Sequence, residues 1–429
     1  MDGLMIFLGM LVFMLVLLSG LPVAFGLGFL AILLLSAYVG PDIATDIAVE
    51  KAYAAIDSDI LVAIPLFILA AQLISATGMG KRLFDAAGVF LWRLRGGLGV
   101  ATIGSSGIFS AMTGSSFVSS STMGLIAIPE LRKAGYGEAK IASAITAGGT
   151  LGSMIPPSIV MIVYGYLTDE SISKLFMAGV LPGLLLIALY SLFMIYTGHA
   201  EHTKPSEKPS QRKRHAVKEA FWGIMAPVLI LGGIYLGIFT ASEAAAVAVV
   251  YCLIIGFFVY RTLNIKTLWE QLMAAAVTSA MVTMIIIGGA ILGHSVIFGR
   301  IPQEVLSAII ALDISPIALL IIINLVLFVL GMFLEVLALM YLVIPLLIPV
   351  IAHMGWDNIW IAVMLLINVN LALITPPMGG VLYVVSHIGN MPLGTVMNGA
   401  LMPIGSLLLV LALTLLFPGL ALWLPGLTG

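Results

Sequence analysis

Two adjacent prolines interrupt a run of residues that is otherwise apolar enough to cross a membrane. They are Pro156 and Pro157, within the sequence GGTLGSMIPPSIVMIVYG from Gly148 to Gly165. Proline lacks an amide donor, clashes with the preceding turn and pushes the residue before it out of the helical region. Because hydrocarbon offers no hydrogen bonds, the carbonyl groups released near residues 152–155 need another partner. Broken helices of this kind typically line a binding site near the middle of the membrane.

A second break lies 220 residues further on, at Pro376 and Pro377 in NVNLALITPPMGGVLYVVS. Other landmarks match at the same offset: Pro129 with Pro349, and the turn Gly135-Tyr136 with Gly355-Trp356. Proline and glycine are common in membrane helices, so coincidence is the alternative. We interpret the matches as the trace of an internal duplication.

The composition indicates an all-α polytopic membrane protein. Hydrophobic residues make up 61% of the chain and charged residues 9%, which excludes a soluble domain. The 429 residues supply roughly ten to twelve spans or their equivalent in hairpins. The N-terminal apolar stretch has Asp2 in place of a basic region, so it is interpreted as a retained helix. Cys252 lies in an apolar run and is interpreted as a small buried filler.

The first half is predicted to cover residues 1–198, with a re-entrant hairpin at 97–131 and a broken helix at 141–165. Its hairpin limbs are too short to cross singly, and both flanks are basic. The other predicted elements are spans near 4–20, 22–39, 59–78 and 174–198, and interfacial segments at 41–57 and 81–95.

Residues 199–219 form a polar, basic linker between the halves. The positive-inside rule places it in the cytoplasm and the N-terminus on the outer side of the membrane. A nucleic-acid or lipid-binding patch is the alternative, but the positive-inside rule explains these charges without it, and no nucleic-acid partner is predicted.

The second half, residues 220–429, repeats the series with a hairpin at 316–350 and a broken helix at 359–385. Its other elements are spans near 222–240, 243–260 and 277–298, and an interfacial segment at 262–276. Five spans plus a hairpin make an odd number of crossings, so the second copy starts from the opposite face. Two such inverted repeats are the usual architecture of a secondary transporter.

The tip of the first hairpin carries hydroxyl groups at Thr113, Ser115 and Ser116, with Gly114 allowing a tight turn. Set against Gly152 to Pro156, this tip is predicted to form a Na⁺ cage of neutral oxygens, with Ser153 and Ser158 as additions. The alternative is that small polar residues let helices pack closely in lipid.

By the same offset, a second cage would combine the tip Gly331 to Glu335 with Ala372 to Pro377. Thr375 would add a hydroxyl, and Asn368 or Asn370 an amide oxygen. Glu335 is an acid placed at membrane depth, which indicates a cation or proton site; the alternative is that it pairs with a nearby polar group.

Neither half of the proposed site carries a deep Lys or Arg. An anionic substrate would therefore be neutralised by bound Na⁺, by hydroxyl groups and by helix N-termini. Because the bound substrate would need Na⁺ to neutralise its charge, the two are expected to be transported together.

Four segments resemble the large membrane subunit of the tripartite ATP-independent periplasmic (TRAP) transporters, within the ion-transporter superfamily. They are TGSSFVSSSTMGLIAIPELRKAGY from Thr113, LGSMIPPSIVMIVYG from Leu151, GMFLE from Gly331 and TPPMGGVLYV from Thr375. The resemblance covers essentially the whole chain. It implies a non-enzymatic, Na⁺-driven importer of organic acids in the bacterial inner membrane, in which a transport domain slides against a scaffold as an elevator.

The resemblance also implies partners and site residues. The partners would be a small membrane subunit of about four helices, a soluble periplasmic binding protein and an organic acid such as a C4-dicarboxylate, sialic acid or another carboxylated sugar. At least two Na⁺ are expected. The candidate Na⁺ ligands are Ser115, Ser116, Gly152, Ser153, Gly331, Glu335, Ala372 and Thr375. The candidate substrate contacts are Thr113, Gly114, Ser115, Ser116, Pro156, Pro157, Thr375 and Pro376.

Three other functions were weighed. A stand-alone Na⁺/carboxylate symporter of the same superfamily would need no binding protein. A channel would need a continuous polar lining, whereas these polar tips are isolated in apolar surroundings. A hydrolase using Ser115 or Ser116 would need a base, and no Lys or His is positioned for that role.

Overall fold

The computed structural model describes residues 23–198 and 213–428, and all regular structure within these ranges is helical. This confirms the predicted all-α class. The predicted span at 4–20 and most of the linker, residues 199–212, lie outside the described residues. The helices of the first half are α2 (Val23–Val39), α3 (Pro41–Ile56), α4 (Ala63–Thr77), α5 (Met79–Leu91), α6 (Gly97–Thr113), α7 (Ser116–Lys133), α8 (Glu138–Met154), α9 (Ile159–Thr168) and α10 (Ile172–Thr197).

The second half begins with α11 (Lys213–Tyr235), so the end of the predicted linker is already helical. The helices that follow are α12 (Ala241–Ile254) with the π-helical turn η1 (Ile255–Val259), α13 (Ile265–Phe298), α14 (Ile301–Ala311), α15 (Pro316–Gly331), α16 (Val336–Met354), α17 (Asn358–Leu373), α18 (Gly380–Gly389), α19 (Leu393–Leu416), α20 (Gly419–Leu422) and η2 (Pro425–Thr428).

The helices of the two halves correspond at the 220-residue offset. Hairpin limbs α6 and α7 match α15 and α16, the broken-helix segments α8 and α9 match α17 and α18, and α10 matches α19. The start positions in each pair agree with the offset to within one residue. Both Pro–Pro peptide bonds are cis. The same series of helices therefore builds this part of both halves, and their opposite orientation in the membrane stays a prediction.

One element differs from the sequence prediction. The interfacial segment at 262–276 and the span at 277–298 form a single helix, α13, of 34 residues. At 1.5 Å per residue it is about 51 Å long, more than the ~30 Å hydrocarbon core. Its counterparts α3 and α4 are separate because Asp57, Ser58 and Asp59 lie between them, and such residues favour turns over helix interiors. The matching positions hold Val277, Thr278 and Ser279, where the helix continues.

Seven helices in the described ranges are long and apolar enough to cross a membrane, or eight if α4 and α5 count as one span. Those two helices meet at an angle of 59°, at Gly78 in the left-handed region (φ 72°). Shorter apolar helices, among them α2, α15, α17 and α18, supply the remaining apolar segments. The chain is thus a multi-pass membrane protein.

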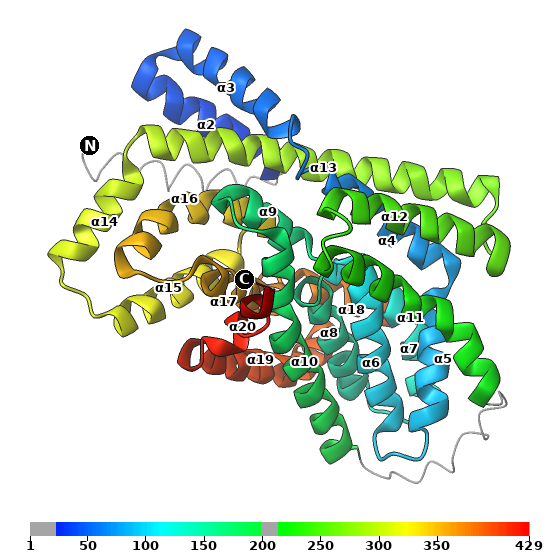
Figure 1. The fold of residues 1–429 in the computed structure, drawn as a ribbon. Coiled ribbons are helices and arrows are strands. Elements are labelled where there is room, and N and C mark those ends of the chain that lie inside the picture. The colour runs from blue at the N-terminus through cyan, green and yellow to red at the C-terminus, as the bar shows by residue number, and fades with distance from the viewer. Residues whose placement is uncertain (1–22, 199–212, 429) are drawn as a thin grey trace.

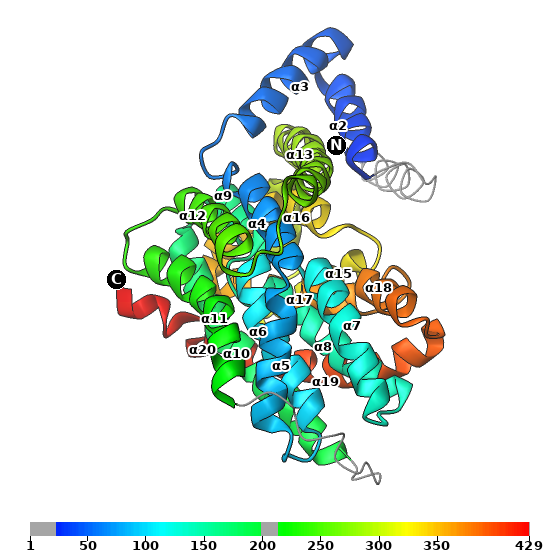
Figure 2. The same cartoon turned by 90° about the vertical axis from the view of Figure 1, so that its right-hand side faces the viewer.

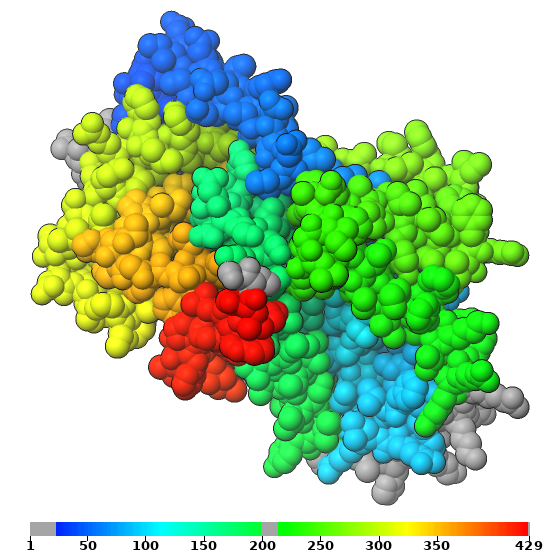
Figure 3. Space-filling view, viewed as in Figure 1, coloured from blue at the N-terminus to red at the C-terminus, as the bar shows by residue number. Residues whose placement is uncertain are grey.

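The helices form two groups, visible in Figures 1 and 2. We call α2, α3, α4, α11, α12 and α13 the frame helices: α13 packs along α2, α3 and α4, and α12 joins α4 to α11. We call α6 to α9 and α15 to α18 the tip block, in which both limbs of the first hairpin pack on α8 and α15 packs on α17. Figure 3 shows α3 projecting beyond the rest of the molecule on one face. The groups meet chiefly where α16 lies against α13 and where α5 joins α6 to α11.

Candidate functional site

The first hairpin turns at Gly114, which adopts a left-handed conformation (φ 61°) and ends α6. Ser115 then caps α7, its side chain accepting a hydrogen bond from the amide of Val118 at 3.4 Å. A Cβ added to Gly114 would lie 2.3 Å from the carbonyl oxygen of Pro157. The backbone of the hairpin tip therefore rests directly on the first helix break.

The first break separates α8, which ends at Met154, from α9, which begins at Ile159. Ile155 is extended (ψ 124°), as expected for a residue before proline. Pro156 and Pro157 have no amide hydrogen to donate to the carbonyl groups of Gly152 and Ser153. A Cβ on Gly152 would lie 2.5 Å from the carbonyl oxygen of Ser115, so only glycine allows this approach.

Hydroxyl groups collect where this tip meets the break. Ser116 Oγ lies 3.0 Å from Ser153 Oγ, and Ser153 Oγ donates to Asn370 Oδ1 at 2.7 Å. The Ser158 hydroxyl is buried and has no hydrogen-bond partner within the structure. Thr113 is the exception, because its hydroxyl lies within the hairpin, 3.2 Å from the carbonyl of Phe109 and 3.1 Å from Ser119 Oγ.

The second tip lies between Gly331, the last residue of α15, and Val336, the first of α16. Glu335 caps α16 and accepts hydrogen bonds from the amides of Leu337 at 2.9 Å and Ala338 at 3.3 Å. Its half-buried carboxylate thus stabilises a helix N-terminus. A Cβ on Gly331 would lie 2.7 Å from Ala372 Cβ, so this tip also rests on its helix break.

The second break is wider than the first, because six residues separate α17 from α18 whereas four separate α8 from α9. Pro156 and Pro157 are buried, whereas Thr375 and Pro376 are half-buried and Pro377 is exposed. The hydroxyl of Thr375 donates to the carbonyl of Leu371 at 2.6 Å. The two sites therefore share the same backbone arrangement, but the second break is more exposed than the first.

Buried amide side chains tie α17 to its neighbours. Asn368 Nδ2 donates to Asn324 Oδ1 at 2.7 Å, and Asn324 lies on the first limb of the second hairpin. Asn370 instead reaches Ser153, in the first half. The sequence analysis named Asn368 and Asn370 but missed Asn324. This residue could have been found because it is a single amide side chain within the otherwise apolar α15.

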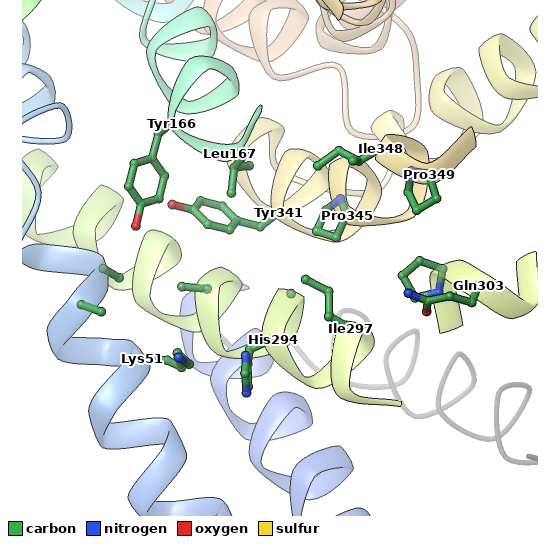
Figure 4. Close-up of a pocket in the computed structure, with 15 residues that line it drawn as sticks. Lys51, Tyr166, Leu167, His294, Ile297, Gln303, Tyr341, Pro345, Ile348 and Pro349 are labelled. Atoms are coloured by element: carbon green, nitrogen blue, oxygen red, sulfur yellow. The ribbon is translucent and has the colours of Figure 1, made fainter. Parts of the chain in front are cut away.

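One cavity in the described residues lies away from both tips, between α3 and α13 on one side and α9, α14 and α16 on the other. Its volume is about 440 Å³ and its lining is mostly apolar. Figure 4 shows Tyr166 and Tyr341 at one end, with Lys51 and His294 across the cavity from Tyr341. Lys51 already pairs with Glu50 at 3.0 Å. None of the predicted site residues lines this cavity, which lies beside the contact between α13 and α16.

Within the described residues, no group of three or more His, Cys, Asp or Glu side chains could hold a metal ion. The oxygens available at the first tip are hydroxyl and backbone carbonyl groups, which suit a hard monovalent cation better than a transition metal. The second tip adds one carboxylate, Glu335.

A polytopic helical protein in which two re-entrant hairpins meet two broken helices is of the secondary-carrier class. Residues 10–420 match the family model described as tripartite ATP-independent periplasmic transporter, DctM component, and the chain belongs to that family. This confirms the resemblance found in the sequence.

Two curated relatives match over nearly their full length. The chain is 36% identical to the sialic acid TRAP transporter large permease protein SiaM of Vibrio cholerae, over 95% of this chain and 96% of that protein. It is 35% identical to the C4-dicarboxylate TRAP transporter large permease protein DctM of Pseudomonas aeruginosa, over 94% and 93% respectively. The crystal structure of the YdaH transporter of Alcanivorax borkumensis shares the fold, with a TM-score of 0.62, 14% identity and 90% coverage of both chains.

Proposed function

We propose that this chain takes up an organic acid across the bacterial inner membrane in symport with Na⁺. The substrate class is supported by the relatives, which are named for sialic acid and C4-dicarboxylates. Their names also describe large permeases of TRAP transporters, so the partners we propose are a small membrane subunit and a periplasmic binding protein that delivers the substrate.

The observation that carries the proposal is the contact between the first hairpin tip and the first helix break. Here Gly114 and Gly152 let two backbones touch, and Ser116 and Ser153 lie 3.0 Å apart. Carbonyl and hydroxyl oxygens meet here, and among the described residues no Lys or Arg side chain hydrogen-bonds to Ser116 or Ser153. This is the kind of neutral oxygen site that Na⁺ occupies in discontinuous membrane helices. In our proposal the first Na⁺ is held by Ser115, Ser116, Gly152 and Ser153.

The second Na⁺ is proposed at the contact between the second tip and the second break. Its ligand groups would come from Gly331, Glu335, Ala372 and Thr375. Because the hydroxyl of Thr375 donates to Leu371, its lone pairs stay free to face a cation. Glu335 would add negative charge close to this site while it caps α16.

The anionic substrate is proposed to lie between the two tips. The N-terminus of α7, which begins at Ser116, offers backbone amides to a carboxylate, whereas Glu335 already accepts from the amides of Leu337 and Ala338 at the start of α16. The side chains and backbone proposed to line the substrate site are those of Thr113, Gly114, Ser115, Ser116, Pro156, Pro157, Thr375 and Pro376. Bound Na⁺ would supply the positive charge that Lys or Arg does not.

The proposed movement is that of an elevator, in which the tip block slides along the frame helices. The arrangement that supports it is the division of the helices into two groups, with an apolar cavity beside the contact between α13 and α16. The periplasmic N-terminus and the inverted repeats 1–198 and 220–429 belong to the same proposal.

The test is uptake of labelled sialic acid and C4-dicarboxylates into proteoliposomes that hold this chain and its small subunit. Uptake is measured with and without an inward Na⁺ gradient, and with and without the binding protein. We expect uptake only when both are present. Na⁺-driven uptake without the binding protein would favour a stand-alone symporter, and uptake independent of Na⁺ would contradict the coupling.

A further inference from the structure

A chain of three buried side chains joins the two halves of the protein at the first tip. Ser116 on α7 lies beside Ser153 on α8, and Ser153 lies beside Asn370 on α17. Both serines are 3% exposed and Asn370 is fully buried. Each hydrogen bond in the chain is therefore shielded from water, where its direction matters most.

The direction of these hydrogen bonds follows from Asn370. Its Nδ2 donates to the carbonyl of Leu366 at 2.9 Å, which fixes Oδ1 as the atom that faces Ser153. An amide oxygen only accepts, so Ser153 must give its single hydroxyl hydrogen to Asn370. Ser153 then has no hydrogen left for Ser116, and the hydrogen between the two serines must come from Ser116.

Both serine hydrogens consequently point along the chain toward Asn370. Ser153 Oγ accepts from Ser116 and keeps one lone pair, and Ser116 Oγ keeps both of its lone pairs, so each oxygen can accept from or bind another partner at the tip. If either hydroxyl turned the other way, its hydrogen would face any cation and repel it.

We propose that Asn370 is a positioning residue for the Na⁺ site of the first half: it turns the hydroxyls of Ser116 and Ser153 so that their lone pairs face the cation. This rests on the proposed Na⁺ coupling and adds to it a residue contributed by the opposite half. One half of the protein would thus supply the hydroxyl ligands, and the other half would orient them.

The experiment is a Na⁺ titration of the purified full-length chain, with choline replacing Na⁺ to keep ionic strength constant. Thermal stability is recorded at each Na⁺ concentration, and the readout is the Na⁺ concentration that gives half of the full stabilisation. In Asn370→Leu and the smaller Asn370→Ala, we expect this midpoint to rise about tenfold, since a directed hydrogen bond is lost. An unchanged midpoint in both variants would overturn the proposal.

Thr150→Val is the matched control. Thr150 lies on the same helix as Ser153, is fully buried, and its hydroxyl bonds with Tyr190 at 3.0 Å outside the chain of three. We expect this variant to lower the melting temperature without moving the Na⁺ midpoint. An equal shift in the midpoint would mean that any buried hydrogen bond has this effect, and would overturn the assignment to Asn370.

A double variant separates positioning from general damage. If Asn370 acts through Ser153, then Ser153→Ala with Asn370→Leu should have the same Na⁺ midpoint as Ser153→Ala alone. Additive shifts would contradict this. If the wild-type chain shows no Na⁺-specific stabilisation, the proposed coupling itself fails; if the wild type responds and the Asn370 variants match it, only the positioning role fails.

Discussion

Gly152 is a residue at which the backbones of the first hairpin and the first broken helix touch. A methyl group here would lie 2.5 Å from the carbonyl oxygen of Ser115 and 2.6 Å from the amide nitrogen of Ser116. Both neighbours are backbone atoms, so no side-chain rotation can relieve the clash. The contact between tip and break therefore requires that Gly152, like Gly114, has no Cβ.

Gly152→Ala should push the tip away from the break. We expect a loss of about 1–3 kcal/mol in stability and a large fall in Na⁺-dependent uptake. The measurements are thermal unfolding and uptake in proteoliposomes. Gly104→Ala is the control, because Gly104 lies on the adjoining α6 with open space around its Cα, and it should retain uptake. Full uptake in Gly152→Ala would show that the close contact is dispensable.

Glu335 caps α16, and a conservative substitution can separate this role from the proposed one at the second Na⁺ site. Glu335→Gln keeps an oxygen that can accept from the amide of Leu337, so the cap and the fold should persist. The charge is removed, and we expect a higher Na⁺ concentration for half-maximal uptake. The check is the Na⁺ dependence of uptake in the variant beside wild type. Superimposable curves would reduce Glu335 to a helix cap.

At the scale of elements, the broken helices can be tested by restoring their amides. In the double variant Pro156→Ala and Pro157→Ala, two new donors could bond the carbonyl groups of Gly152 and Ser153. The helix would then continue from α8 toward α9, and those oxygens would be withdrawn from the tip. We expect normal membrane insertion and uptake that is lower by roughly tenfold. Insertion is checked by protease protection, and wild-type uptake would remove the argument from the break.

The hairpins and breaks were predictable from the sequence because their signals are local. Paired prolines, Gly114 and the serine-rich tip each restrict the chain within a few residues. The predicted hairpin at 97–131 compares with limbs that run from Gly97 to Lys133, and the predicted broken helix at 141–165 compares with α8 and α9, which run from Glu138 to Thr168.

Other features were not predictable because they depend on distant contacts or on the absence of a breaker. The continuity of α13 required noticing that Val277 to Ser279 replace Asp57 to Asp59 of the first half. The role of Glu335 as a cap depends on the geometry of the tip. The bond from Ser153 to Asn370 spans 217 residues, and no local pattern specifies it.

At the scale of the whole molecule, the account requires the tip block to move along the frame helices. A cross-link between α13 and α16 tests this. A Cβ on Gly289 would lie 2.6 Å from Tyr341 Cβ, close to the ~3.8 Å spacing of a disulfide after a small shift. In a Cys252→Ser background, the pair Gly289→Cys and Tyr341→Cys should transport when reduced and stop when oxidised. If the oxidised form took up substrate as fast as the reduced form does, sliding would be contradicted.

The control cross-link joins two frame helices. A Cβ on Gly288 would lie 3.2 Å from Leu27 Cβ on α2, so Gly288→Cys with Leu27→Cys can form a comparable bridge. Because both residues belong to the same group, oxidation should leave uptake unchanged. Arrest by this bridge as well would mean that cross-linking inhibits for a reason other than blocked sliding.

The central claim is that two tip-and-break contacts each hold a Na⁺ that the substrate requires. The measurement that tests it most directly is the initial rate of organic-acid uptake by the wild-type complex as external Na⁺ is raised, with choline or K⁺ as replacement. We predict that the initial rate rises sigmoidally with Na⁺, is zero without Na⁺, and stays at zero when K⁺ replaces Na⁺. A rate independent of Na⁺, or equal with K⁺, would contradict it.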